Sequence, residues 1–301
     1  IRPTDADFVN VGAFGGTATD IARFATARVG GNLLLFIAAG LLKTWSGSVL
    51  AAVTGAPANA VDGCLYKGRM YAIARDSHTL YGARISPNVN DFSVGTGGLQ
   101  VDVETYDNES NVGLLVCGHS LIIAKEESLT RLTGVSTVDI KIEKESEGIS
   151  REVGVLARGT FIPVLDHFFF ISEHGPYLGS ESGVESLNMK LHGVLDNFDR
   201  VMWRDAVAVH NIGRHEIVLC VPTPGSTSDA EAPRFMWVYD YLNKKWDGPH
   251  SRSAFGSITA LWKYERPSGR KTFMSGNRLG WVLDEDIPHW FQDDTTRLGA
   301  G

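Results

Sequence analysis

Three histidines at turns are the residues of this sequence whose type and spacing suggest ligand chemistry. The chain has nine His, and neutral imidazole is a common ligand of zinc and other transition metals. His119, His167 and His215 lie at matching positions beside turns. If these turns converged, the three rings could share a metal ion. The alternative is that they are ordinary turn residues, too far apart at a rim to share an ion, and we therefore expect no metal and no other cofactor.

Paired carboxylates are the second chemistry to consider, because glycoside hydrolysis needs two carboxyl groups that face each other across the substrate. The acidic residues form no distinctive pair, and we interpret most of them as solvated turns. The segment 179–183, GSESG, carries Glu where a nucleophile elbow would carry Ser. The sequence also contains no P-loop, HExxH or EF-hand motif. We therefore expect no catalytic residue and no enzyme activity; the acidic candidates considered are Glu126, Glu127, Asp284, Glu285, Asp286, Asp293 and Asp294.

Cysteine content and net charge exclude further classes of protein. Cys64, Cys117 and Cys220 are far apart and form no CxxC pair, so we expect buried free thiols rather than a disulfide scaffold. The net charge is −7, which argues against a protein that grips nucleic acid through its phosphates, since that grip requires clustered Lys and Arg.

The most apolar stretch is LLLFIAAGLL, residues 33–42. It is about half as long as a membrane-spanning helix, and the sequence shows no signal-peptide pattern. Its glycine favours a hairpin or a pair of buried strands. We therefore expect no membrane association.

The elements that must position these residues follow a repeated pattern. A turn with Gly or Asp leads into about five apolar residues, then a short polar turn, then a second strand with a bulky residue near its middle. The turns recur every 37 to 56 residues, close to the roughly 40 to 50 residues of a β-propeller blade. The turn residues are Gly31, Gly68, Gly118, Asp166, Gly213 and Gly269, and the bulky residues are Trp45, Tyr81, Leu132, Tyr177, Val238 and Trp281.

The pattern predicts an all-β protein, a β-propeller of about six blades, over residues 22–286. The competing architecture is a β-sandwich. Residues 1–21 and 287–301 are interpreted as N-terminal and C-terminal extensions. The remaining elements expected are further strands at 90–94, 138–145 and 184–189, and two segments that could form short helices, 20–29 and 185–198.

Three segments are candidates for contacts with other proteins. The insertion 222–234, PTPGSTSDAEAPR, is typical of a surface loop, and insertions on a repeat scaffold often carry binding. The tail 284–298 is the second candidate. KIEKESEG, residues 141–148, alternates in charge; it favours an exposed outer strand, where charge prevents edge pairing, or else a face between subunits.

Several units resemble the β-propeller nozzle, or tail tubular, proteins of short-tailed bacteriophages. The resemblance rests on YKGRMYAIARDSHTLYGARIS (66–86), GLLVCGHSLIIAKEESLTRLTG (113–134), FMWVYDYLNKKWDGP (235–249) and SGNRLGWVLDED (275–286). It is carried by Gly-rich turns, by the aspartate and aromatic turn of VYDYLNKKW and by the lack of a catalytic motif. The chain departs from the family in length, because nozzle proteins often carry extra platform domains.

The resemblance implies a structural protein of the virion tail, without catalysis. Such a protein assembles as a ring, expected here to be a homohexamer, around the channel through which DNA is ejected. Its neighbours would be adaptor or portal-proximal tail proteins and tail fibres. DNA would pass without specific binding, and an acidic wall suits this role because it repels the duplex.

Two other functions remain open from the sequence. The chain could be a cellular β-propeller that serves as a platform for protein partners, which predicts a monomer with an apolar rim patch. It could also be a propeller carbohydrate-binding protein or glycosidase, which predicts a central pocket with converging carboxylates, His or aromatic residues. The oligomeric state distinguishes them, since a closed ring favours the tail protein.

Overall fold

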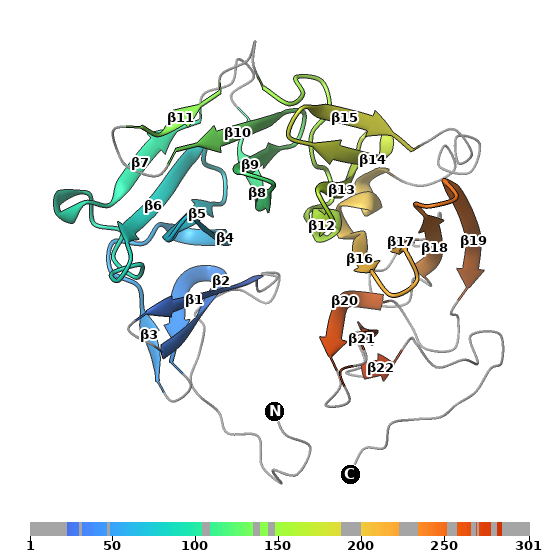
Figure 1. The fold of residues 1–301 in the computed structure, drawn as a ribbon, viewed down its shortest axis with the longest axis horizontal. Coiled ribbons are helices and arrows are strands. Elements are labelled where there is room, and N and C mark those ends of the chain that lie inside the picture. Colours follow the sequence, from blue (N-terminus) through green and yellow to red (C-terminus); the bar gives the residue numbers. More distant parts are fainter. Residues whose placement is uncertain are drawn as a thin grey trace, which may run out of the picture. The chain divides into compact units, whose positions relative to one another are not determined.

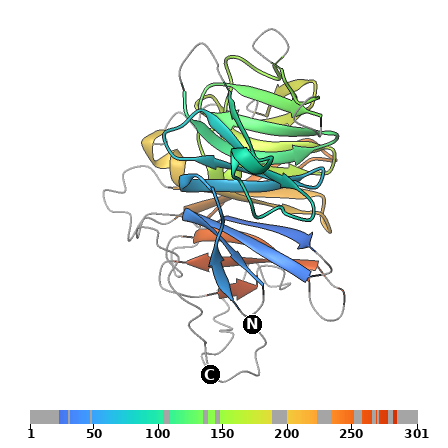
Figure 2. The same ribbon diagram turned by 90° about the vertical axis from the view of Figure 1, so that its left-hand side faces the viewer.

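The structure is a computed structural model, and β-strands are the main regular structure of the described residues (Figures 1 and 2). The chain divides into two compact units, one up to Gly148 and one from Ile149. Three short 3-10 segments, η1 (Val94–Thr96), η2 (Arg158–Thr160) and η4 (Arg200–Asp205), interrupt the strands of the described part. The structure describes residues 23–29, 32–46, 49–103, 109–134, 139–143, 148–187, 200–222, 234–251, 258–265, 269, 271–277 and 282–284.

The first unit contains a seven-stranded sheet and a four-stranded sheet, all antiparallel. The larger sheet divides into blade 1 (β1 to β3) and blade 2 (β4 to β7), which are joined where β2 pairs with β4. Blade 3 comprises β8 to β11. The strands are β1 (Arg23–Val29), β2 (Asn32–Trp45), β3 (Leu50–Ala52), β4 (Ala58–Tyr66), β5 (Arg69–Ala74), β6 (Thr79–Ile85), β7 (Leu99–Asp102), β8 (Asn111–Cys117), β9 (Ser120–Lys125), β10 (Leu129–Thr133) and β11 (Lys141–Ile142).

The second unit contains three antiparallel sheets in which neighbouring strands are consecutive in sequence. Blade 4 comprises β12 to β15, blade 5 comprises β16 to β19, and blade 6 comprises β20 to β22 within the described residues. The strands are β12 (Ile162–Val164), β13 (His167–Ser172), β14 (Gly175–Ser180), β15 (Gly183–Ser186), β16 (Val207–Asn211), β17 (Glu216–Pro222), β18 (Arg234–Asp240), β19 (Lys245–Ser251), β20 (Ile258–Glu265), β21 (Lys271–Asn277) and β22 (Val282–Asp284).

Up-and-down sheets of four strands are the blades of a β-propeller. The prediction of an all-β propeller of about six blades is therefore confirmed. The predicted turns also fall where the pattern places them: Gly68, Gly118, Asp166 and Gly213 each lie between the first and second strands of a blade. Gly269 lies between β20 and β21, and Gly31 is outside the described residues.

Burial explains why the second strand of each blade is so apolar. Every residue of β5 and β9 is buried, as are five of the six residues of β13. Strand β5 shows the reason most clearly, because one of its faces packs in the apolar core with blade 1 and the other in the core with blade 3. The outermost strands β7 and β15 are at least partly exposed along their whole length, so burial decreases from the second strand to the fourth in blades 2 and 4.

Several local predictions are wrong. Residues 33–42 form neither a hairpin nor a strand pair but part of the single strand β2. Within 20–29, the described residues form strand β1, not a helix. Residues 90–94 form no strand; Asp91 makes an isolated bridge to Thr54, and Val94 begins η1.

Other predictions are met in part or lie outside the described residues. The strand predicted at 138–145 is limited to β11 among the described residues, and that at 184–189 ends at Ser186. The second helix candidate, 185–198, lies mostly outside them, and Glu185 and Ser186 belong to β15. The extensions 1–21 and 287–301 also lie outside. No helix in the described ranges is long and apolar enough to cross a membrane.

Candidate functional site

The same end of each blade carries two of its connections. The first and second strands meet there, and because the strands are antiparallel, the connection between the third and fourth strands returns to the same end. We call this end the hairpin edge of a blade. The inner strands β4 and β8 contact each other in the first unit, as do β12 and β16, and β16 and β20, in the second. Hairpin edges of successive blades within a unit are therefore neighbours.

Exposed apolar side chains gather at the hairpin edges. Large hydrophobic residues exposed away from these edges are few among the described residues: Phe24, Leu41 and Val49. The remainder lie in the connections of the hairpin edges or in the strand ends beside them. Exposed apolar side chains that recur at equivalent positions are a feature of sites of protein association. These residues, with exposed fractions of 36% to 64%, are Ile85, Val94, Val116, Leu165, Ile212, Leu242 and Tyr264.

Both the backbone conformation and the exposure of Leu165 are unfavourable for the stability of the monomer. It lies between β12 and β13 with φ of 54°, in the left-handed region that costs a residue with a Cβ roughly 1–2 kcal/mol. Its side chain is 61% exposed, so its apolar surface gains little from burial in the monomer. Residues kept in this way against local stability are concentrated at functional sites.

Polar contacts fix the hairpin edges of blades 2 and 3 in the first unit. The Tyr66 hydroxyl donates to the His119 carbonyl at 2.5 Å, which joins the β4–β5 turn to the β8–β9 turn. The buried Asp62 carboxylate accepts the backbone N–H of Leu114 at 2.7 Å. Strand β4 is thereby held against β8 by hydrogen bonds as well as by apolar packing.

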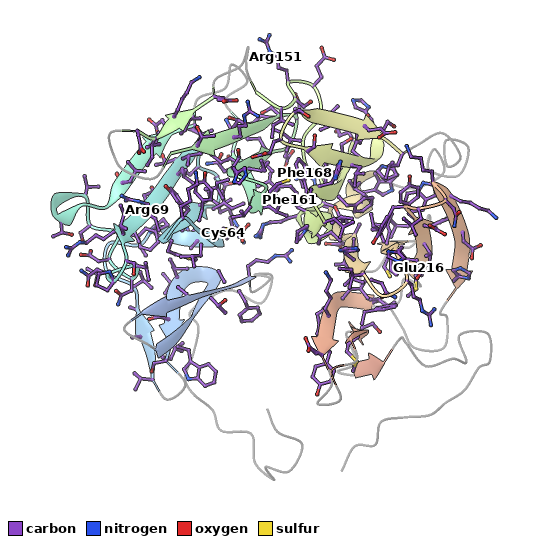
Figure 3. The ribbon with its side chains drawn as sticks, in the orientation of Figure 1. Cys64, Arg69, Arg151, Phe161, Phe168 and Glu216 are labelled. Atoms are coloured by element: carbon purple, nitrogen blue, oxygen red, sulfur yellow. The ribbon has the colours of Figure 1, made fainter. Side chains whose placement is uncertain are left out.

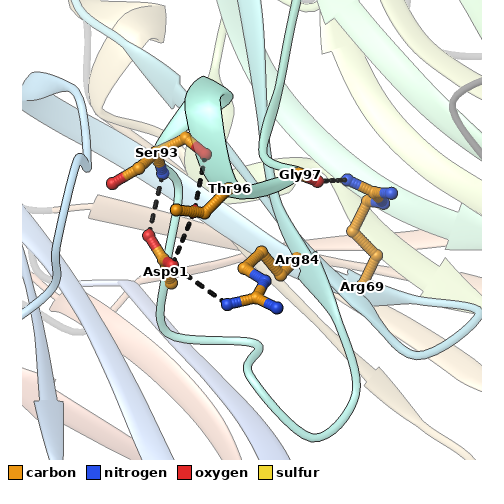
Figure 4. Close-up of polar contacts among 6 residues, drawn as sticks. All are labelled: Arg69, Arg84, Asp91, Ser93, Thr96 and Gly97. Atoms are coloured by element: carbon orange, nitrogen blue, oxygen red, sulfur yellow. Dashed lines mark hydrogen bonds and ion pairs between the residues drawn. The ribbon is translucent and has the colours of Figure 1, made fainter.

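The connection from β6 to β7, residues 86–98, is long and internally braced (Figure 4). Asp91 accepts the Ser93 backbone N–H at 3.0 Å and the Thr96 hydroxyl at 2.8 Å, and it pairs with Arg84 at 3.6 Å. The pKa of the Asp91 carboxyl is lowered mainly by the hydrogen bond from the Ser93 backbone, and further by hydrogen bonds from the side chains of Ser93 and Thr96. The connection therefore presents Val94, 56% exposed, from a fixed backbone, and such preorganisation reduces the entropy lost on binding.

Arg69 holds the far end of the same connection. Its side chain is 2% exposed, and Nη1 donates to the Ala83 carbonyl at 2.6 Å and to the Gly97 carbonyl at 3.3 Å. Val89 and Phe92 are buried in the core between blades 1 and 2. The connection is thus part of the scaffold, with its tip exposed.

A tyrosine bridges two histidines at the hairpin edge of blade 5. Tyr241 Oη lies 3.2 Å from His210 Nε2 and 3.2 Å from His215 Nδ1, and the Tyr241 backbone N–H donates to the His215 carbonyl at 3.2 Å. The pKa of His210 is lowered to about 4, mainly by burial and further by the charges of Lys263 and His215. The β16–β17 and β18–β19 connections are joined through these side chains.

Asp240 shapes the β18–β19 connection beside this cluster. Its carboxylate accepts the backbone N–H groups of Leu242 and Asn243, both at 2.9 Å, and the Asn243 side-chain amide at 2.6 Å. These bonds to Asn243 are the main cause of the lowered pKa of Asp240. The turn closes into an Asx-type conformation that leaves Leu242 64% exposed.

The structure does not bring the three sequence-predicted histidines together into a ligand set. His119, His167 and His215 are each exposed near a first-to-second-strand turn. In the described part of the chain, no group of three or more His, Cys, Asp and Glu is placed to hold a metal ion. The sequence did not single out His210, which lies five positions before His215 in HNIGRH. Two features could have indicated it: a His on either side of one turn, and the tyrosine-rich turn YDY in the next hairpin.

The other candidates are widely distributed. Cys117 and Cys220 are buried and in no disulfide bond, as expected, whereas Cys64 is partly exposed. Burial and the nearby Asp62 raise the pKa of Cys64 to about 12. Glu126 and Glu127 lie in the β9–β10 turn, and Asp284 ends β22. Four acidic candidates lie outside the described residues: Glu285, Asp286, Asp293 and Asp294. The same is true of most of the contact candidates, namely residues 223–233, 285–298 and 144–147.

Comparisons with known proteins show the fold and no family. No protein-family model and no curated protein sequence matches the chain. A chain in the structure of S. cerevisiae Dbp5 bound to Nup159, Gle1, IP6 and ADP is similar, with a TM-score of 0.50 and 11% identity over 83% of this chain and 70% of that one. The Neurospora crassa Pan2 WD40 domain matches with a TM-score of 0.37 and 9% identity over 87% of this chain and 61% of that one. At these identities the likeness concerns the fold alone.

Proposed function

We propose that this chain is a structural protein of a short phage tail, a nozzle subunit that assembles into a ring around the DNA-ejection channel. The observation that carries the proposal is the repeated exposure of apolar side chains at the hairpin edges of successive blades. In a cyclic ring each subunit presents one surface to a different surface of its neighbour. The hairpin edges supply one of these surfaces.

Two further features support an assembly role. The hairpin edges are braced by hydrogen bonds that involve the side chains of Tyr66, Asp91 and Tyr241, so a partner meets a surface that is already ordered. The sequence resemblance to nozzle proteins and the net charge of −7 fit a channel that DNA passes without binding. The chain acts in the virion tail without catalysis, next to adaptor proteins and tail fibres.

The first test is negative-stain electron microscopy of the purified protein together with its mass in solution. We expect closed rings, with sixfold symmetry, around a hole about as wide as a DNA duplex. A monomer at all concentrations, also in the presence of the adaptor or portal ring of a candidate phage, would contradict the proposal. It would favour the cellular interaction platform, or the carbohydrate-binding protein or glycosidase, which a glycan array would then separate.

Surface variants test whether the hairpin edge carries the contact. Leu242→Asp should shift the mass toward the monomer because it places a charge in an apolar interface. Val49→Asp is the matched control, since Val49 is similarly exposed, at 60% against 64% for Leu242, but lies away from a hairpin edge. Equal effects of the two substitutions, or none from either, would remove the hairpin edge from the proposal.

A further inference from the structure

Three potential metal ligands converge at the hairpin edge of blade 5. His210 Nε2 and His215 Nδ1 each lie 3.2 Å from the Tyr241 oxygen. The ring centroid of Tyr241 is 5.5 Å from that of His210 and 5.7 Å from that of His215. His210 is 4% exposed, whereas His215 is exposed and Tyr241 is partly exposed. The cluster therefore has an ordered inner side and an outer side open to solvent.

The separations between these atoms suit coordination. With bonds of about 2.0–2.1 Å to a tetrahedral ion, adjacent ligand atoms lie about 3.3 Å apart. Hydrogen bonds between nitrogen and oxygen span about 2.7–3.2 Å. The phenol oxygen lies 3.2 Å from both imidazole nitrogens, at the long end of that range and close to the ligand spacing.

The His210 ring is already oriented for a ligand. A hydrogen bond between this ring and the Pro163 carbonyl acts to raise the pKa of His210, against the larger effect of burial. With Nε2 facing Tyr241, the tautomer that carries its proton on Nδ1 leaves the Nε2 lone pair directed at the cluster. Metal-binding histidines in proteins are typically held in this way by a carbonyl behind the ring. The lowered pKa of His210, about 4, keeps the ring neutral at pH 7, as a ligand must be.

We propose that His210 Nε2, His215 Nδ1 and the Tyr241 oxygen form a binding site for one divalent transition-metal ion, of the zinc and copper(II) class. Imidazole suits these ions, and carboxylates, which calcium and magnesium prefer, are not part of the cluster. Solvent completes the coordination on the exposed side. Binding replaces the phenol proton, which is released to solvent, so affinity increases with pH. The inference is independent of the phage-tail proposal.

The surrounding charges set the strength of the site. The Lys263 ammonium acts on His210 and opposes a cation. The Asp240 carboxylate interacts with His215 and favours one. Burial and Asp240 raise the pKa of Tyr241, which makes its proton harder to displace. Lys263→Gln should therefore tighten binding several-fold.

The test is isothermal titration of the metal-free full chain with zinc chloride at pH 7.5. We expect one ion per chain, with affinity reduced about tenfold or more in His215→Asn and Tyr241→Phe. Asn tolerates the left-handed backbone of His215, φ 60°, and Phe keeps the ring of Tyr241, so both variants should fold, which circular dichroism checks. His119→Asn is the matched control, because His119 is an exposed turn histidine of the other unit.

Copper(II) provides a second readout. Electron paramagnetic resonance of the bound ion should show hyperfine coupling to two imidazole nitrogens in the wild-type protein and to one in His215→Asn. Absence of zinc binding below about 1 mM, or equal losses in His215→Asn and His119→Asn, would overturn the site. So would tighter binding in Tyr241→Phe, because the hydroxyl would then only compete with the metal for the imidazoles.

Discussion

The histidines of this chain show how position decides the chemistry of one residue type. His210 lies within strand β16 and is 4% exposed, while His215 lies five residues later in a turn and is exposed. Tyr241 contacts both rings. The buried member is neutral because charging it in this environment costs desolvation energy. A sequence pattern can detect a histidine beside a turn, but it cannot say which histidine the neighbouring hairpin will cover.

The lowered pKa of His210 predicts a loss of stability in acid. The unfolded chain takes up a proton near pH 6.5, whereas the folded ring stays neutral down to about pH 4. Between these values the unfolded state binds more protons, so the free energy of unfolding falls as the pH falls, by up to about 1.4 kcal/mol per pH unit. Urea midpoints at pH 7.5, 5.5 and 4.5 measure this; His210→Gln should show a flatter dependence, and parallel curves would contradict the assignment.

Leu165 predicts a trade-off between stability and association. Replacing Leu165, at φ 54°, with Gly removes backbone strain and should raise the free energy of unfolding by about 1 kcal/mol. The same change removes an exposed apolar side chain and should weaken the proposed self-association. Thermal unfolding and solution mass check the two effects; a variant that associates as strongly as wild type would remove Leu165 from the contact.

At the scale of elements, blade 4 shows how aromatic packing depends on the strand opposite. Phe168 and Gly179 are partners across β13 and β14. Phe168 packs edge-on against Phe161, with ring centroids 5.5 Å apart (Figure 3). It also stacks on Phe170 at 5.8 Å. A Cβ added at Gly179 would lie 2.2 Å from the Phe168 ring, so the absent side chain is what makes room for the ring.

Gly179→Ala should therefore destabilise the protein by about 1–3 kcal/mol, because the buried ring must move. Gly95→Ala is the control: Gly95 lies in η1 with nothing within 4 Å of an added Cβ, and its substitution should be neutral or slightly stabilising. Chemical denaturation measures both. Similar effects in the two variants would show that the cost is generic and does not come from Phe168.

The elements could be predicted from sequence wherever a turn carried Gly or Asp between apolar runs. Strand β2 could not, because Gly40 was interpreted as the turn of a hairpin. In the structure Gly40 has φ of 78°, and the register with β4 shifts there, so this glycine marks a β-bulge in a continuous strand. Residues 20–29 were ambiguous because RFATARV alternates too weakly to exclude a helix. At the site, His215 was predictable from the sequence, whereas His210 and its contact with Tyr241 depend on pairing between distant hairpins.

At the scale of the whole molecule, composition limits the possible partners. The chain carries 28 Lys and Arg against 35 Asp and Glu. A protein with this net negative charge has no general electrostatic attraction to phosphate groups. The comparisons with known structures establish the fold only, so function must be argued from surface and charge.

This charge predicts that duplex DNA does not bind. Fluorescence anisotropy with a labelled 30-base-pair duplex should show no saturation up to about 100 μM protein at 150 mM salt, which is weaker than typical non-specific binding. A basic DNA-binding domain serves as the positive control. Salt-sensitive binding below about 10 μM would contradict the proposed role as a non-adhesive channel wall.

The contiguity of the blades in sequence has a consequence for how such a chain can change over evolutionary time. From blade 3 onward, each sheet is built from strands that follow one another without a crossover. A duplication or deletion in the gene whose breakpoints fall between blades adds or removes a complete sheet and leaves the pairing of the others intact. Blades 1 and 2 are the exception, because β2 pairs with β4. Recombination between blades 1 and 2 would break the hydrogen bonds that pair β2 with β4. We therefore expect related genes to vary in the number of blades after blade 2 and to inherit blades 1 and 2 together.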